Sequence, residues 1–87
     1  MKDIKFNLEK NAQLKKERGA SFEDLLNNGD LISIKKHSKR KNQNIMLFEY
    51  QKYIWIVPFV KNKQGEIFLK TLYPSRKYTK VVKGELK

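Results

Sequence analysis

The first third of the chain has the pattern of two short helices. Residues 8–18 are mostly polar and charged, and they lie between Asn7, a good N-cap residue, and Gly19, which suits a left-handed C-terminal position. This pattern predicts a helix over residues 8–18. The preceding Ile4, Lys5 and Phe6 are compatible with a short strand.

The second helix is predicted from its cap. Ser21 is followed three residues later by Asp24, which resembles a capping box. Phe22, Leu25 and Leu26 form one apolar face after this cap, and Gly29 marks the end of the helix.

Beyond residue 30 the apolar positions recur with a period of two, which is typical of strands. Gln51-Lys52 is short enough for a hairpin turn, and 61–65 resembles a second hairpin loop. The polar segment 38–44 is predicted to be a loop. The predicted strands are residues 31–36, 45–50, 53–60 and 66–73.

Two details of this sheet can be predicted from side-chain type. The strand over 53–60 is apolar on both faces, which indicates a central strand, but Pro58 cannot donate a ladder hydrogen bond, so we expect a bulge or strand end there. Alternation over 66–73 places Tyr73 on one face with Ile67 and Leu69, and Lys70 on the exposed face with Phe68.

Together these elements predict one α+β domain over residues 1–87. Two N-terminal helices pack on a four-stranded antiparallel sheet, and Pro74 separates the last strand from a short C-terminal helix at about 75–83. The helices cover one face of the sheet, and Trp55 lies in the core. The other face is expected to be an open, basic binding surface.

The distribution of charge indicates a polyanionic partner. The formal net charge is +11, yet residues 1–30 carry equal numbers of basic and acidic side chains, so the whole excess follows residue 30. A lysine-rich composition without a binding role is the alternative interpretation. No segment combines a basic face with a broad apolar one, so we expect no membrane partner.

Composition also excludes several kinds of chemistry. The chain has no cysteine and one histidine, which excludes disulfides and disfavours a metal site, and we expect no cofactor. No apolar run approaches the ~20 residues that span a bilayer, and the N-terminus lacks the apolar core of a signal peptide. We therefore expect a cytoplasmic protein.

A basic run over residues 35–41, which begins at the end of the strand predicted over 31–36, carries the strongest local charge. Charge of this kind binds phosphates without reading sequence, although a solvated loop is the alternative. His37 lies within the run and is the candidate general base or acid for RNA cleavage, with Glu49 as a second candidate. The residues of the run that are predicted to bind RNA are Lys35, Lys36, Lys39, Arg40 and Lys41.

A second basic group surrounds the end of the last strand. Arg76 offers a planar fork that suits phosphate oxygens, and with Lys70 it could stabilise charge on a phosphorane in a metal-free reaction. Lys77 is predicted to contact RNA, and Tyr78 to stack on bases or donate a proton. For Tyr73 a place in the core is an equally good interpretation.

Two segments resemble a known family. Residues 6–11 (FNLEKN) with 17–24 (ERGASFED), and residues 68–77 (FLKTLYPSRK), are similar to the opening and the last strand of BrnT-type toxins. Those proteins carry a Lys-Asn pair, a Gly-x-Ser-Phe-Glu step and a terminal Ser-x-Arg-like element. Here Arg76 matches the functional terminal arginine, whereas Lys70 stands where the family usually has another arginine, and Pro74 is unusual.

The resemblance implies a RelE-like fold and a metal-independent endoribonuclease of a bacterial type II toxin–antitoxin pair. It would cleave mRNA, with or without the ribosome, and its cognate antitoxin would be a DNA-binding protein. Operator DNA would be contacted only through the antitoxin complex. Two alternatives stay open: a non-catalytic basic module that binds RNA or DNA, and a toxin of the same fold that acts on a protein target such as gyrase.

Overall fold

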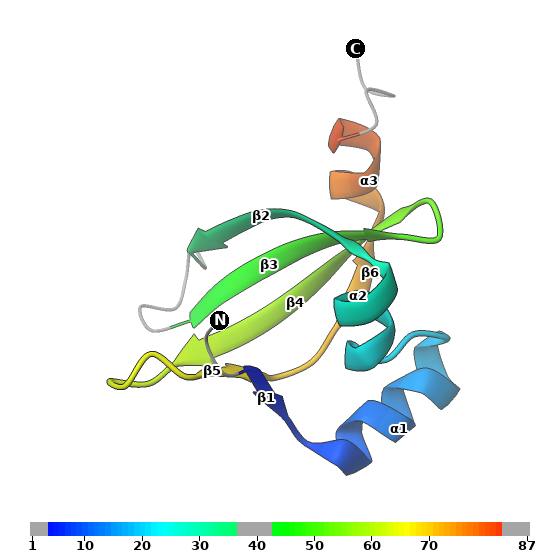
Figure 1. Cartoon of the computed structure of the whole chain (residues 1–87). Helices are drawn as coiled ribbons and strands as arrows, with labels where there is room; N and C mark the ends of the chain where they lie inside the picture. The colour runs from blue at the N-terminus through cyan, green and yellow to red at the C-terminus, as the bar shows by residue number, and fades with distance from the viewer. Residues whose placement is uncertain (1–3, 37–42, 83–87) are drawn as a thin grey trace.

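The computed structural model describes residues 4–36 and 43–82. It is an α+β fold of three helices and a mixed sheet (Figure 1). The elements in chain order are β1 (Ile4–Phe6), α1 (Leu8–Arg18), α2 (Phe22–Asn28), β2 (Asp30–Lys36), β3 (Gln43–Tyr50), β4 (Tyr53–Lys61), β5 (Ile67–Leu69), β6 (Tyr73–Ser75) and α3 (Arg76–Val82).

The first helix begins and ends where its capping residues predict. The Asn7 side chain accepts a hydrogen bond from the backbone N–H of Lys10, at 3.0 Å. Gly19 adopts φ 80°, the left-handed conformation that a glycine tolerates best, and its N–H bonds to the Lys15 carbonyl. Both predicted caps of α1 are confirmed.

The second helix is capped both by its own box and by a residue of α1. Ser21 and Asp24 make the reciprocal capping-box bonds that the sequence predicts. Asn11, buried in α1, accepts a 2.8 Å hydrogen bond from the N–H of Phe22 and donates to the Glu23 carboxylate. The two helices are therefore joined through the otherwise unpaired N–H groups at the start of α2.

The sheet differs from the predicted four antiparallel strands. Its order is β1-β5-β4-β3-β2, with β6 paired to β4, and β1 pairs with β5 in parallel so that Ile4 lies opposite Ile67. The prediction of a purely antiparallel sheet was wrong. A three-residue segment has too little pattern to show which distant strand it joins, and only the folded chain brings it beside β5.

The predicted last strand is interrupted. Both β5 and β6 pair with β4, but Leu69 lies opposite Phe59 and Tyr73 opposite Ile56, so the chain between them holds one residue more than β4 does. The extra residue reverses the expected alternation after position 70: Leu72 is fully buried on the helix side and Tyr73 faces the other side. Tyr73 therefore does not share a face with Leu69.

Pro58 explains where the interruption lies. Its carbonyl accepts a hydrogen bond from the N–H of Lys70, so the proline nitrogen, which has no proton, faces the same neighbouring strand. The β4 strand continues through Pro58 without a break, opposite Ile45. The expected bulge is thus on the facing strand rather than at the proline.

Both faces of the sheet are partly covered. Helices α1 and α2 pack over one face, where Leu14, Phe22 and Leu25 meet Phe48 and Trp55, which confirms the core position of the tryptophan. On the other face α3 stands over one end of β4 (Figure 1). A smaller cluster there consists of Ile45, Leu47, Ile54 and Ile56 with Tyr73 and Tyr78. The second face is therefore less open than predicted.

Candidate nucleic-acid interface

Three cationic side chains line one hollow where α3 meets the hairpin between β3 and β4. Lys52 comes from the hairpin, and Arg76 and Lys80 come from α3; Tyr53 and Thr79 complete the lining. The hollow has a volume of about 330 Å³. Three like charges around one cavity repel each other, and an anion placed between them relieves that repulsion.

The hairpin presents Lys52 through an unusual backbone. Gln51 and Lys52 adopt φ values of 52° and 67°, the positive values that a two-residue type I′ hairpin requires. Neither residue is the glycine or asparagine that such a turn prefers. The closing pair is Tyr50 opposite Tyr53, and the Trp55 indole N–H braces the turn by donating to the Tyr50 carbonyl at 3.2 Å.

Helix α3 is held in place by one buried hydroxyl. The Thr79 side chain accepts a 2.8 Å hydrogen bond from the N–H of Ile54 and donates to the carbonyl of Ser75 at 2.6 Å. The Ser75 hydroxyl accepts from the N–H of Tyr78 at the start of the helix. These bonds fix the first turn of α3 on β4, and with it the position of Arg76.

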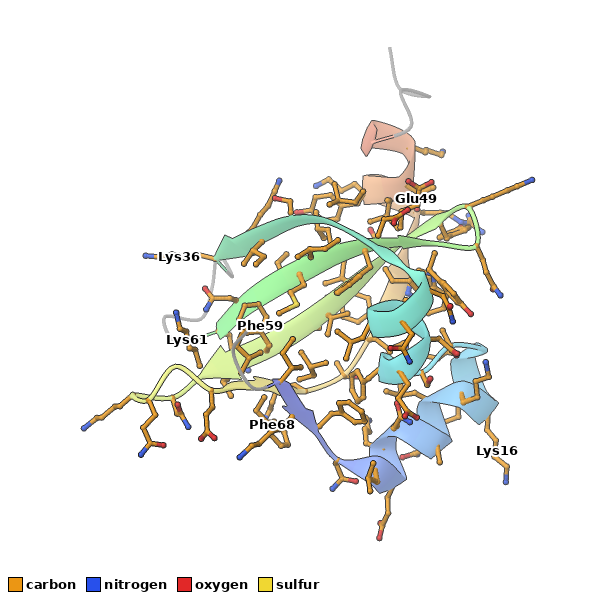
Figure 2. All side chains as sticks on the ribbon, in the orientation of Figure 1. Lys16, Lys36, Glu49, Phe59, Lys61 and Phe68 are labelled. Atoms are coloured by element: carbon orange, nitrogen blue, oxygen red, sulfur yellow. The ribbon has the colours of Figure 1, made fainter. Side chains whose placement is uncertain are left out.

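The acid nearest in the sheet to this cationic cluster is Glu49. Glu49 on β3 lies opposite Ile54 on β4, which in turn lies opposite Ser75 on β6. The backbones of Glu49 and Ser75 are therefore two strand spacings apart, which corresponds to about 10 Å. Figure 2 places Glu49 at the end of the sheet where α3 packs. Glu49 is therefore in the neighbourhood of Arg76, but it does not line the hollow.

Lys70 is not part of this cluster. It lies opposite Pro58, four residues along β4 from Ile54, which corresponds to about 13 Å. Its ammonium group stands 5.8 Å from the ring centroid of Phe68, on the exposed side where the sequence placed both. The predicted grouping of Lys70 with Arg76 around one phosphate is not what the fold produces, although both can contact different phosphates of one strand.

Two predicted RNA-binding residues contact each other. The ammonium group of Lys35, on β2, stands 5.4 Å from the ring centroid of Tyr78, on α3. Tyr78 also packs on the apolar cluster of Ile45, Leu47, Ile54 and Ile56. Base stacking on Tyr78 would therefore have to displace Lys35.

The remaining predicted residues divide into two groups. Lys36 lies at the far end of β2, where it lines a different hollow, and Lys77 is exposed on α3. The other four lie outside the described residues: His37, Lys39, Arg40 and Lys41.

Sequence reasoning missed the four residues that line the hollow with Arg76: Lys52, Tyr53, Thr79 and Lys80. The spacing of Lys80 was a usable signal, since a residue four positions after Arg76 shares its helix face. Lys52 and Tyr53 gave no such signal, because their closeness to α3 follows from the pairing of β6 with β4. Only the tertiary structure brings the hairpin and the helix together.

Comparisons with models of protein families, with curated proteins and with solved structures found no match to this chain. Within the described ranges, no three histidine or acidic side chains come together as metal ligands. No helix among the described residues is both long enough and apolar enough to cross a bilayer.

Proposed function

We propose that this protein binds RNA through the cationic hollow formed by Arg76, Lys52 and Lys80. The observation that carries the proposal is the convergence of three cations from two elements on one cavity with a tyrosine in its wall. Arg76 supplies a planar fork for two phosphate oxygens, and the lysines supply further charge. Proteins that bind single-stranded nucleic acid combine cationic grooves with aromatic side chains in this way.

The reaction we propose is cleavage of RNA without a metal. The 2′-oxygen attacks the adjacent phosphorus while a general base takes its proton, and the 5′-oxygen leaves with a proton from a general acid. Arg76 and its two lysine neighbours stabilise the charge that develops on phosphorus. His37 and Glu49 are the candidate proton-transfer groups.

The biological role we propose is that of a cytoplasmic, RelE-like toxin of a type II toxin–antitoxin pair, acting on mRNA. This role rests on the resemblance of residues 6–11, 17–24 and 68–77 to BrnT-type toxins, in which Arg76 matches the functional arginine. The cognate DNA-binding antitoxin would be its protein partner, and operator DNA would be reached through that complex.

A non-catalytic RNA-binding module is the second candidate. It is favoured by one observation: the described lining of the hollow contains cations, a tyrosine and a threonine, but no carboxylate or imidazole. Such a site binds phosphates but supplies no general base for proton transfer.

A comparison of two arginine variants tests the proposed function. Arg76→Ala removes the fork from the hollow, and Arg18→Ala removes the same group from the exposed end of α1. We expect Arg76→Ala to weaken binding of a labelled RNA of about twenty nucleotides at least tenfold and to abolish both cleavage and growth arrest in bacteria, with Arg18→Ala unchanged. Equal affinities for the two variants would refute the RNA-binding site.

Cleavage is tested separately from binding. Intact RNA after long incubation, together with affinity that falls steeply with salt, would identify the non-catalytic module. Growth arrest without loss of RNA would favour a protein target such as gyrase. His37→Ala and Glu49→Gln then show which side chain transfers the proton, because the essential one loses cleavage but keeps RNA affinity.

A further inference from the structure

The β2 strand exposes an unusual amount of aliphatic surface on an open edge. It is the last strand in the sheet order, and no described strand pairs with its outer side. Leu31, Ile32 and Ile34 are 52%, 42% and 55% exposed. An edge strand with exposed apolar side chains offers both unpaired backbone groups and apolar area, which makes it a template for another strand.

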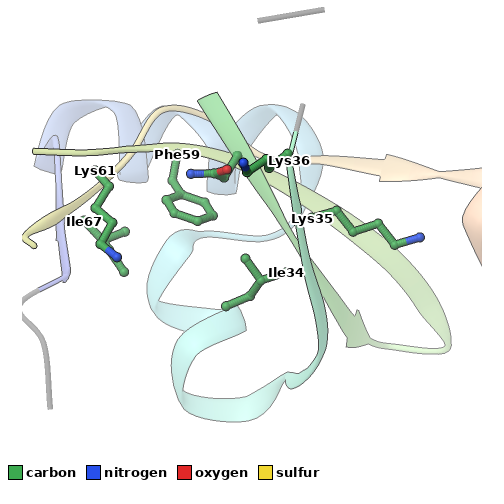
Figure 3. A pocket seen from close by; sticks show the side chains of 7 residues that line it. Ile34, Lys35, Lys36, Phe59, Lys61 and Ile67 are labelled. Atoms are coloured by element: carbon green, nitrogen blue, oxygen red, sulfur yellow. The ribbon is translucent and has the colours of Figure 1, made fainter. Parts of the chain in front are cut away.

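A hollow lies beside this edge, on the same face of the sheet as α1 and α2, but no residue of either helix lines it. Its volume is about 420 Å³, and Ile34, Phe59 and Ile67 form its apolar part. Lys36 and Lys61 lie at its sides, while Lys35 is directed away from it (Figure 3). The hollow is therefore apolar within and cationic at its margin.

The chemistry of this hollow fits a peptide better than a nucleic acid. Its exposed apolar groups are aliphatic, and Phe59 is only 3% exposed, so no ring is presented for a base to stack on. The exposed Phe68 lies on the opposite face, opposite Val60. Aliphatic side chains beside an open backbone edge are instead typical of strand addition by a peptide.

We infer that the β2 edge and the hollow beside Ile34 bind an extended, acidic segment of another protein. The segment adds a strand to β2, inserts an apolar side chain against Ile34, Phe59 and Ile67, and places carboxylates near Lys36 and Lys61. The charge of the margin favours an acidic partner. It disfavours a second copy of this chain, which would bring another +11 to a margin that is already cationic.

This interface is separate from the proposed RNA site. The hollow lies at Phe59 and the Asn44 end of β3, whereas Arg76 follows Ser75 beside Ile54, at the other end of β4. Figure 2 shows Lys36, Phe59 and Lys61 at one end of the sheet and Glu49 at the other. The inference does not rest on RNA binding, and a protein that binds no RNA would still carry this edge.

Binding of synthetic peptides to the full chain tests the inference. The probe is a fluorescein-labelled peptide of about ten residues that alternates valine and glutamate. A serine–glutamate peptide of equal length keeps the charge and removes the apolar side chains. A valine–glutamate peptide that is N-methylated at alternate residues keeps the charge and the apolar side chains, but its methylated backbone nitrogens cannot donate strand hydrogen bonds. We expect the first peptide to bind at least tenfold more tightly than either of the others.

Two matched protein variants locate the site. Ile34→Ser removes an exposed apolar group from the hollow, and Leu8→Ser removes one from α1, where Leu8 is 74% exposed. We expect Ile34→Ser to weaken binding of the valine–glutamate peptide about tenfold and Leu8→Ser to leave it unchanged, both with wild-type circular dichroism.

Three outcomes would overturn the inference. Equal binding of the serine–glutamate peptide would show that only charge is recognised. Loss of RNA binding in Ile34→Ser with peptide binding intact would assign the hollow to nucleic acid. A dimer in sedimentation that Ile34→Ser dissociates would assign the edge to a second copy of the chain.

Discussion

The Thr79 hydroxyl accepts a hydrogen bond from the backbone N–H of Ile54, at 2.8 Å. Ile54 is fully buried, and β6 ends at its partner Ser75, so the last backbone donor of this pair of strands is satisfied by a side chain of the following helix. The bond ties the helix that carries Arg76 to the central strand of the sheet.

Thr79→Val therefore tests how α3 is held. Valine fills the same space but cannot accept the bond, which leaves a buried N–H unpaired, at a cost of about 1–3 kcal/mol in the free energy of unfolding. We expect this loss in urea denaturation, together with faster hydrogen exchange at Ile54 and weaker RNA binding. Thr71→Val, in the segment between β5 and β6, is the matched control and should change stability by less than about 0.5 kcal/mol. A similar effect of both variants would show that the bond to Ile54 contributes nothing specific.

We expect Lys52 to lower the stability of the fold and to strengthen RNA binding. Its positive φ costs a non-glycine residue about 1–2 kcal/mol, which Lys52→Gly relieves in part. We expect this variant to unfold at higher urea concentration and to bind RNA more weakly, because the hollow loses a cation. In salt titrations the slope of log affinity against log salt should become less steep by about 0.7.

Lys63→Gly is the control for both effects of Lys52→Gly, on stability and on RNA affinity. It removes the same charge from the loop between β4 and β5, where Lys63 is not among the residues with positive φ. We expect no gain in stability and unchanged RNA affinity. If Lys52→Gly also left the affinity and the salt slope unchanged, Lys52 would not belong to the RNA site.

Asn11 is expected to stabilise the fold rather than to contact a ligand. Its side chain accepts a hydrogen bond from the Phe22 N–H and donates to Glu23, so Asn11→Ala leaves a buried donor unpaired. We expect a loss of about 1–3 kcal/mol in the free energy of unfolding, with RNA affinity per folded molecule unchanged. Asn27→Ala, at an exposed position of α2, should alter stability by less than about 0.5 kcal/mol. An Asn11→Ala protein of wild-type stability that had lost RNA binding would reverse this assignment.

Asp24 is expected to give the protein a pH-dependent contribution to stability. The hydrogen bond from Lys15, followed by bonds from Ser21, holds the pKa of the Asp24 carboxyl below its ordinary value. A lowered folded-state pKa means that the stabilisation is complete above the ordinary pKa of about 4 and is lost as the pH falls below it.

The variant Asp24→Asn measures this contribution. Asp30→Asn, which removes another acidic side chain, is its matched control. At pH 7 we expect Asp24→Asn to be less stable than the wild type by about 1 kcal/mol, a modest value because the partner lysine is exposed. The difference should shrink as the pH falls from about 4 towards 2. A difference that stays constant over that range would exclude the charged form of Asp24 as its source.

The N-terminal residues on which the proposed resemblance to BrnT-type toxins is based have structural explanations of their own. Asn11 and Ser21 both satisfy N–H groups at the start of α2, and Phe22 is fully buried. A motif that caps one helix from another constrains sequence strongly without contacting a ligand. The proposed resemblance in this segment therefore bears on the fold more than on the chemistry.

The local interactions of this protein could be predicted from its sequence alone. The bounds of α1 and α2, the hairpin at Gln51 and Lys52, and the core position of Trp55 depend on caps, turns and alternation among residues close in the chain. Their physical causes act over a few residues, so a pattern reveals them. The α+β class and the position of the excess charge followed in the same way.

Relations between distant segments depend on how the whole chain folds and could not be predicted in this way. The extra residue between β5 and β6 turned Tyr73 to the opposite face from Leu69, and the parallel pairing of β1 with β5 joined segments about sixty residues apart. The same long-range pairing placed Lys52 beside Arg76 and kept Lys70 away from it. Charge along the chain therefore indicated a polyanionic partner, whereas the register of β4 with its neighbours decided which cations share one site.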